Sequence, residues 1–208
     1  MSQLKPIVFA SSNAGKIREL DELLAPLNIQ VKSQVELGVE PLPETAVTFI
    51  ENAIVKARHA SSMTGMPAVA DDSGLEVDAL AGAPGLYSAR FASMHNAGSG
   101  DEDNNILLLK KLESVADEQR TARFRSVMVY LEHENDPSPI IAQGVWEGSI
   151  LRAAVSGGGF GYDPVFCSSD TNQAVSTLDK SEKNKLSHRG KAVRLLIESL
   201  TQQSALAR

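Results

Sequence analysis

The pattern of apolar and polar positions predicts a chain of alternating helices and strands. Short apolar runs with flanking polar turns predict strands, and apolar positions three and four residues apart predict helices, as at Leu20, Leu23, Leu24 and Leu27. The predicted elements are a strand at 7–10, helices at 15–24 and 45–63, a strand at 67–70, a helix at 102–115, strands at 122–132 and 140–151, a strand at 164–167 and a helix at 187–200.

The two long strands at 122–132 and 140–151 follow one another through Asn135-Asp136-Pro137, which predicts an antiparallel pair. A purely parallel, doubly wound sheet would not contain such a hairpin, so the predicted fold class is mixed α/β. The chain has 208 residues, of which 42% are hydrophobic, enough for one domain or one domain with two lobes. With no repeat or linker in the sequence, we expect a single domain over 1–208.

Charge and cysteine content narrow the possible functions. A net charge of −6 argues against broad binding of nucleic acid or of an anionic membrane. The single cysteine, Cys167, excludes an internal disulfide and a cysteine-based zinc site, and the four histidines have no metal-ligand spacing. A bound metal is therefore expected to be a hard, oxygen-bound ion such as Mg²⁺. No apolar run approaches the roughly 20 residues of a membrane span, and 7–10 is too short for a signal-peptide core, so a cytoplasmic location is expected.

The first candidate site is the polar turn after the first strand, Ser11 to Lys16. A strand that runs through small residues into a helix leaves backbone N–H groups directed at an anion, and Lys16 adds a positive charge. This is not a Walker loop, because Ile17 stands where the Mg²⁺-binding Ser or Thr would be. The alternative is an ordinary strand-to-helix turn.

The second helix has a polar face in which Glu44, Thr48, Asn52 and Lys56 recur every four residues. A carboxylate at one end and an ammonium at the other could contact a metal and a phosphate chain. The alternative is a solvated face of an amphipathic helix.

Paired acids follow the apolar run 68–70, in the segment Asp71-Asp72-Ser73-Gly74. Two adjacent carboxylates at the end of a strand are costly unless a cation neutralises them, which is typical of Mg²⁺ sites in phosphoryl chemistry. The alternative is a tight Asp/Gly turn.

Two segments near the C-terminus could bind a base and an anion. Gly157–Asp163 places aromatic rings among glycines, which suits a loop that stacks on a flat base and lacks the spacing of a dinucleotide fingerprint. Lys183, Lys185, His188 and Arg189 lie near a helix start that Ser187 could cap. The alternative for these cations is an exposed basic segment.

Together these segments resemble the inosine triphosphate pyrophosphatase family, in particular its bacterial branch. The resemblance spans nearly the whole chain, and its anchors are Ser12–Lys16, Phe49–Ala53, Ala70–Leu75, Gly82–Gly85, Gly158–Pro164 and Ser187–Gly190. It implies a long mixed sheet with two lobes around a central cleft, a homodimer, and hydrolysis of dITP, ITP and XTP to the monophosphate and pyrophosphate, which keeps these nucleotides out of DNA and RNA.

The resemblance also implies roles for individual residues. Asp72 would be the catalytic proton acceptor and would hold Mg²⁺ with Glu44, and Asp71 would support that pair. The implied substrate-binding residues are Ser11, Ser12, Asn13, Ala14, Gly15, Lys16 and Lys56 at the phosphates, Ser73 at the nucleotide, Phe160, Gly161, Tyr162 and Asp163 around the base, and Lys183, His188 and Arg189. Ser12 stands where the family often has glycine.

Three other classes of protein remain as alternatives. A Maf-type pyrophosphatase for pyrimidine or modified nucleotides usually carries paired arginines in its phosphate loop, and this loop has none. A non-catalytic nucleotide-binding protein would be expected to lack the acids Glu44, Asp71 and Asp72. A P-loop phosphotransferase is disfavoured by the missing Walker residues.

Overall fold

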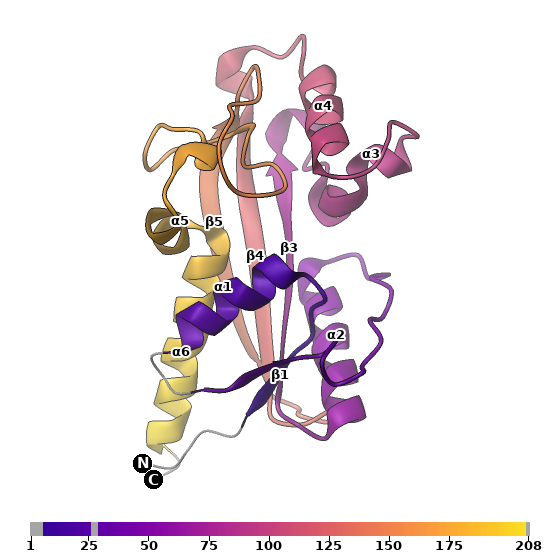
Figure 1. Cartoon of the computed structure of the whole chain (residues 1–208), viewed down its shortest axis with the longest axis vertical. Helices are drawn as coiled ribbons and strands as arrows, with labels where there is room; N and C mark the ends of the chain where they lie inside the picture. The colour runs from indigo at the N-terminus through magenta and orange to yellow at the C-terminus, as the bar shows by residue number, and fades with distance from the viewer. Residues whose placement is uncertain (1–5, 26–28, 207–208) are drawn as a thin grey trace. The chain divides into compact units, whose positions relative to one another are not determined.

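The structure is a computed structural model that describes residues 6–25 and 29–206 (Figure 1). Leu27, expected on the first helix, lies outside these residues. The chain forms two compact units, each assembled from separate segments. Unit 1 comprises Met1–Asp72, Ser126–Gly144 and Arg189–Arg208, and unit 2 comprises Ser73–Arg125 and Val145–His188.

The strands form one mixed sheet in the order β2-β1-β3-β4-β5-β6. Their bounds are Ile7–Phe9 (β1), Val31–Ser33 (β2), Ala68–Val77 (β3), Thr121–Leu131 (β4), Ile140–Ile150 (β5) and Phe166–Ser168 (β6). β1 pairs in parallel with β2 and β3, whereas β5 and β6 are antiparallel. Because the connection 132–139 is too short for a crossover, β4 and β5 are also antiparallel. The predicted mixed α/β class is confirmed.

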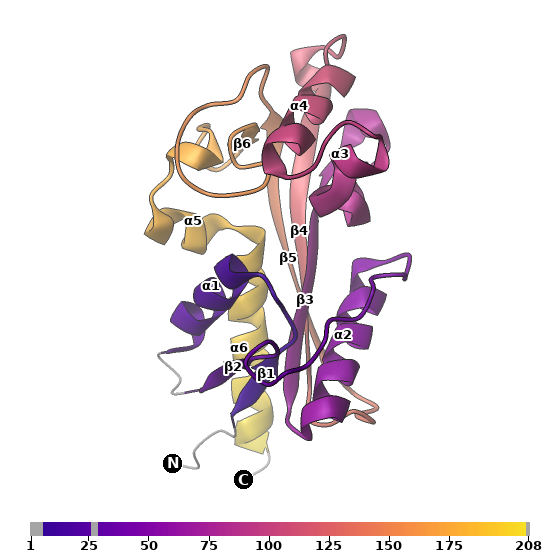
Figure 2. The same cartoon turned by 45° about the vertical axis from the view of Figure 1, so that its right-hand side comes forward.

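Unit 1 has an apolar core on each face of its strands. α1 (Ala14–Leu24) and α6 (His188–Leu206, in unit 1 from Arg189) cover one face, and α2 (Phe49–Thr64) covers the other (Figures 1 and 2). The first core joins Leu20 and Leu196 to Phe9 and Val69 of the strands. The second consists largely of small side chains, including Ala53, Ala57 and Ala60 of α2 with Ala68 and Ala70 of β3. Small residues on both partners let α2 approach β3 closely.

Unit 2 has one core, which contains Trp146, Phe124 and Phe166 of the strands and Leu108 and Leu112 at the end of α4. The unit contains the helices α3 (Phe91–Met94), α4 (Asp101–Lys111) and α5 (Lys180–Leu186) and four short 3₁₀ segments, Asp78–Leu80, Gly85–Arg90, Asp117–Gln119 and Val175–Thr177. No helix within the described ranges is both long and apolar enough to cross a membrane.

Polar side chains fix where the helices begin. The Asn13 side chain accepts hydrogen bonds from the backbone N–H groups of Gly15 and Lys16, so it caps α1. Thr48 accepts from the Glu51 N–H and donates to the Glu51 carboxylate, which caps α2. Asp179 caps α5 through the Glu182 N–H.

Two expectations about the elements are wrong, and one is confirmed with an addition. The strand predicted at 67–70 continues to Val77, so Asp71-Asp72-Ser73-Gly74 is extended strand and not a polar turn. The second helix begins at Phe49, because Thr48 caps it, and the segment from 45 lies outside it. The helix predicted at 187–200 is confirmed as α6, which begins at His188, and the short helix α5 that ends before it at Leu186 has no counterpart among the predicted elements.

Candidate active site

The two adjacent acids of β3 point to opposite faces of the sheet, because successive side chains of a strand alternate. Asp71 lies on the same face of the sheet as Val69 and contacts residues of α1 and α6. Asp72 lies on the same face of the sheet as Ala70 and contacts residues of α2. Strand alternation therefore divides the pair into two separate polar clusters within unit 1.

Asp71 is the centre of the first cluster. It is 1% exposed, and its carboxylate lies 2.9 Å from the Lys16 Nζ and 3.3 Å from the Arg189 Nε. Burial alone would raise the pKa of Asp71, but the cations of Lys16, Arg189 and Lys56 outweigh it and hold that pKa below its usual range. Asp71 is therefore a carboxylate at neutral pH. Burial lowers the pKa of Lys16, and Asp71 opposes this change.

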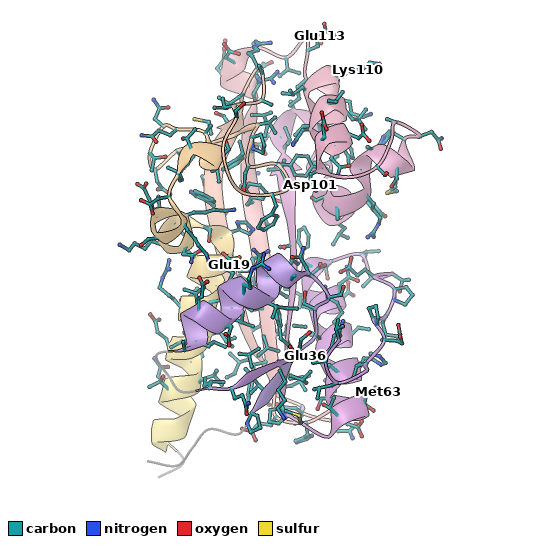
Figure 3. All side chains as sticks on the ribbon, viewed as in Figure 1. Glu19, Glu36, Met63, Asp101, Lys110 and Glu113 are labelled. Carbon is teal, nitrogen blue, oxygen red and sulfur yellow. The ribbon has the colours of Figure 1, made fainter. Side chains whose placement is uncertain are left out.

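Arg189 also belongs to this cluster. Its Nη1 lies 2.6 Å from the Glu19 Oε2, and both residues are buried. Glu19, which Figure 3 labels on α1, was not among the candidate residues from the sequence. The signal for it was its spacing: Glu19 is one helical turn after Lys16, so both side chains lie on one face of α1.

Asp72 is the centre of the second cluster. The Lys56 Nζ lies 3.2 Å from the Asp72 Oδ1 and 2.8 Å from the Glu44 Oε1, so one ammonium lies between two carboxylates. The Asn52 Nδ2 donates to the other oxygen, Oδ2, at 3.0 Å. Burial and then Glu44 raise the pKa of Asp72, against the opposite effects of Lys56 and Asn52. Burial lowers the pKa of Lys56, but Asp71, Asp72 and Glu44 outweigh it and the net shift is upward.

The expected helical face over Glu44, Thr48, Asn52 and Lys56 is only partly correct. Asn52 and Lys56 lie on α2, whereas Glu44 precedes the helix and Thr48 is its cap. The Asn52 side chain accepts a hydrogen bond from the Ala46 N–H at 3.0 Å, which fixes the segment that carries Glu44. Glu44 thus reaches Lys56 through this loop rather than through helical spacing.

The segment Ser11–Lys16 leads from β1 into α1, as expected: Ser11–Asn13 form the turn, and Ala14–Lys16 are the first residues of the helix. Ser11 is buried, and its Oγ accepts a hydrogen bond from the Asn13 N–H. Ser12, Asn13 and Ala14 are exposed. The Asn13 carboxamide oxygen occupies the position at the start of α1 where an anion's oxygen could bind the same N–H groups.

Unit 2 gathers a second set of the predicted residues in the loop before β6. The Asp163 Oδ2 accepts from the Phe160 N–H at 2.9 Å and lies 2.6 Å from the Lys183 Nζ. The Lys183 Nζ also lies 4.5 Å from the centroid of the Phe160 ring, a cation–π distance. Phe160 is 43% exposed, whereas Asp163 is 4% exposed.

The remaining candidates in unit 2 are Gly161, Tyr162, Ser73 and His188. Gly161 lies in the left-handed region, at φ 63°. Tyr162 is part of the apolar core, and its hydroxyl donates to the Ser88 carbonyl at 2.9 Å. Ser73 is half-buried in β3 directly after Asp72. The buried His188 ring stacks on Phe124, with ring centroids 4.7 Å apart.

Within unit 1, the structure therefore forms two clusters: one joins Asp71 to Lys16, Arg189 and Glu19, and the other joins Asp72 to Lys56, Glu44 and Asn52. Within unit 2, it brings Phe160, Asp163 and Lys183 together. Among the described residues, no three His, Cys, Asp or Glu side chains are gathered as a metal site.

These features define a mixed α/β protein with buried acids paired to cations on strand β3 and an aromatic loop in unit 2. A family model described as the Ham1 family matches residues 7–199, so the chain belongs to the Ham1 family. This confirms the family expected from the sequence and removes the Maf-type alternative.

Named relatives and a solved structure support the assignment of the chain to this family. The chain is 54% identical over 194 residues to the "dITP/XTP pyrophosphatase" of Thioalkalivibrio sulfidiphilus, covering 93% of this chain and 97% of the relative. It is 50% identical over 197 residues to the protein of that name from Salmonella paratyphi A, covering 95% and 98%. The solved structure of a HAM1 protein from Coxiella burnetii superimposes with a TM-score of 0.87 at 45% identity, covering 96% of this chain and all of that one.

Proposed function

We propose that this chain is a Mg²⁺-dependent pyrophosphatase that hydrolyses the deaminated purine nucleotides dITP, ITP and XTP to the monophosphate and pyrophosphate. The observation that carries the proposal is the Lys56 ammonium between the carboxylates of Glu44 and Asp72, 2.8 and 3.2 Å away. Relatives that are 50–54% identical bear the name dITP/XTP pyrophosphatase, which supports the substrate class. The proposed enzyme acts in the cytoplasm as a homodimer.

The second cluster fits a magnesium ion by the chemistry of its donors. Glu44 and Asp72 offer carboxylate oxygens, which Mg²⁺ prefers, and usually one or two carboxylates are enough because the ion also keeps water and binds substrate phosphates. The position of Lys56 already indicates that this pair attracts a cation. When bound, Mg²⁺ would neutralise charge on the triphosphate.

Asp72 is the proposed proton acceptor for the attacking water. Lys56 binds one of its oxygens and Asn52 the other, so the carboxylate has a fixed orientation. Burial raises the pKa of Asp72 and brings its basicity closer to neutral pH, where a general base is most effective. Removal of the water's proton prepares attack on the α-phosphorus, and pyrophosphate leaves.

The first cluster is proposed to bind the phosphates. Lys16 is held by Asp71, which stays ionised and opposes the lowering of the Lys16 pKa by burial. Lys16, Lys56 and the turn Ser11–Gly15 would neutralise the distal phosphates, so that pyrophosphate becomes a good leaving group.

The base is proposed to be bound by the unit 2 loop and by the cations of 183–189. Phe160 offers an exposed aromatic face for stacking, and Ser73, Gly161, Tyr162, Asp163 and Lys183 complete the proposed contacts. His188 and Arg189 would read the edge of the purine. Arg189 has only donors, which suits the 6-keto oxygen of hypoxanthine and opposes the 6-amino group of adenine.

The test is a panel of nucleoside triphosphates with Mg²⁺, in which pyrophosphate and orthophosphate are measured separately. We expect dITP to give dIMP and pyrophosphate in one step, and ATP to react poorly. The matched variants are Glu44→Gln, which should lose activity, and Glu40→Gln, an exposed acid four residues earlier, which should retain it. Accumulation of dIDP with orthophosphate would overturn the proposed reaction.

A further inference from the structure

Helix α4 holds the aromatic loop of unit 2 at Gly161. The Gly161 N–H donates to the Asp101 Oδ2 at 2.6 Å, and the Gly161 carbonyl accepts from the Asn105 Nδ2 at 3.0 Å. Both backbone polar groups of one loop residue are therefore bound by one helix. Asp101 and Asn105 are four residues apart, so they lie on the same face of α4, with Asp101 at its first position (Figure 3).

The residues on either side of Gly161 have separate anchors. Tyr162 is fixed in the core and donates to the Ser88 carbonyl, while Asp163 binds the Phe160 N–H and Lys183. The Phe160 side chain remains 43% exposed between these fixed points. Because Gly161 directly follows Phe160, the two hydrogen bonds from α4 restrict the direction in which the Phe160 ring extends.

The helix that provides these bonds is itself anchored to unit 2. The buried Asn104 accepts from the Ala92 N–H at 2.8 Å and donates to the Ala89 carbonyl at 3.3 Å. Leu108 of the same helix is fully buried in the core. Groups on a rigid helix position a loop more precisely than groups on another loop can.

We propose that Asp101 and Asn105 are positioning residues for nucleotide binding, which act by fixing Gly161 and thereby the stacking face of Phe160. The proposal rests on the proposed function, in which Phe160 stacks on the base. Neither residue is expected to take part in the chemistry at the phosphates. Their loss should therefore weaken nucleotide binding and leave the chemical step intact.

The first experiment compares Asp101→Ala with Glu102→Ala. Both remove an acid from the first turn of α4, but only Asp101 bonds the loop. We expect Asp101→Ala to raise KM for dITP roughly fivefold or more, with kcat within about twofold, because part of a stacking contact is lost. The inhibition constant of pyrophosphate, a ligand without a base, should not change. Glu102→Ala should match the wild type, and Asp101→Asn, which keeps an acceptor oxygen, should recover much of the affinity.

The second comparison is Asn105→Ala with Asn104→Ala. Each removes a buried carboxamide from α4, so both should lower the urea midpoint. Only Asn105 bonds Gly161, so only Asn105→Ala should raise KM for dITP. An equal KM in the two variants would show that α4 acts through stability alone and would overturn the proposal.

Amide exchange at Gly161 tests the contact without any assay of activity. We expect the Gly161 N–H to exchange faster in Asp101→Ala than in Glu102→Ala, because its acceptor is gone. Unchanged exchange, or faster exchange with a wild-type KM, would overturn the positioning role. A wild-type protein that does not cleave dITP would instead overturn the proposed function, and the exchange result would still stand as a test of the contact.

Discussion

Replacement of Arg189 by Met tests whether its guanidinium reads the base, supports the buried acids, or does both. The Arg189 Nη1 lies 2.6 Å from the Glu19 Oε2 and its Nε lies 3.3 Å from the Asp71 Oδ2, and the residue is only 3% exposed. Met keeps the apolar length and removes every donor. Two buried carboxylates would then each lose a cation.

The expected loss of stability follows from this burial. Breaking a buried ion pair by removing one partner costs about 3–5 kcal/mol, because a charge is left uncompensated. For a chain of this size, 1 kcal/mol corresponds to roughly 2–4 °C, so Tm should fall by roughly 6–20 °C. The matched control is Arg194→Met on the same helix, whose side chain is exposed and should shift Tm little.

Thermal melts and competition assays separate the two roles. If Arg189 bonds the 6-keto oxygen, the variant should lose roughly 10- to 150-fold of its preference for ITP over ATP. Glu19→Gln removes only the support of Arg189, so it should lower Tm and leave that preference nearly intact. If the thermal melting curve of Arg189→Met overlays that of Arg194→Met, the inference that Arg189 stabilises the buried acids is refuted. An unchanged ITP/ATP ratio would assign Arg189 to the phosphates and the buried acids.

Three further predictions concern other parts of the molecule. Glu44→Gln and Asp72→Asn should each lower kcat at least ~10²-fold in steady-state assays at saturating Mg²⁺ without unfolding the chain, since both remove charge from the proposed metal site. Burial and then Asp101 raise the pKa of Tyr162, so the protonated hydroxyl stabilises the folded state fully below pH ~10, and this stabilisation is lost as the pH rises further. In urea titrations at high pH, the midpoint of Tyr162→Phe should therefore fall less steeply with pH than the midpoint of the wild type. Gly74→Ala should lower the free energy of unfolding by about 1–3 kcal/mol in a urea titration, because its Cβ would collide with the Gly85 carbonyl oxygen.

The sequence predicted most reliably what depends on local patterns. The long strands 121–131 and 140–150 match their predicted bounds within one residue, because both are long runs rich in apolar residues that are separated by the turn residues Asn135-Asp136-Pro137. The first helix was also predicted well, since its face of leucines is regular. The mixed class followed from these elements.

The continuation of β3 could not be predicted in the same way. Asp71-Asp72-Ser73-Gly74 has the composition of a turn, and local propensity favours that structure. The cations that make a strand possible there come from Lys16, 55 positions away, and Arg189, 118 positions away. Only the tertiary fold brings these charges to the acids. Local propensity therefore predicts a turn at Asp71–Gly74, where the folded chain forms a strand.

Contacts made by single side chains at a distance were also missed. The sequence predicts Asn52 only as part of a helical face, although it binds both Asp72 and the backbone of the Glu44 segment. Asp101 and Asn105 carried no signal, because acids are common in the first turn of any helix. Their contacts with Gly161 depend on where the loop lies in unit 2.

The division of the chain into interleaved segments has a consequence for how the protein is synthesised. The core of unit 1 needs Ala192, Val193 and Leu196 of α6 beside residues of β1 and α1, and α6 is synthesised after all the other described elements of that unit. Strand β1 and helix α1 must therefore remain incompletely packed until α6 has left the ribosome. Many proteins fold from the N-terminus as they emerge, but here unit 2 has all its segments by His188 and can finish first. Ribosome-bound chains ending before Arg189 should expose the apolar strands of unit 1 to chaperones.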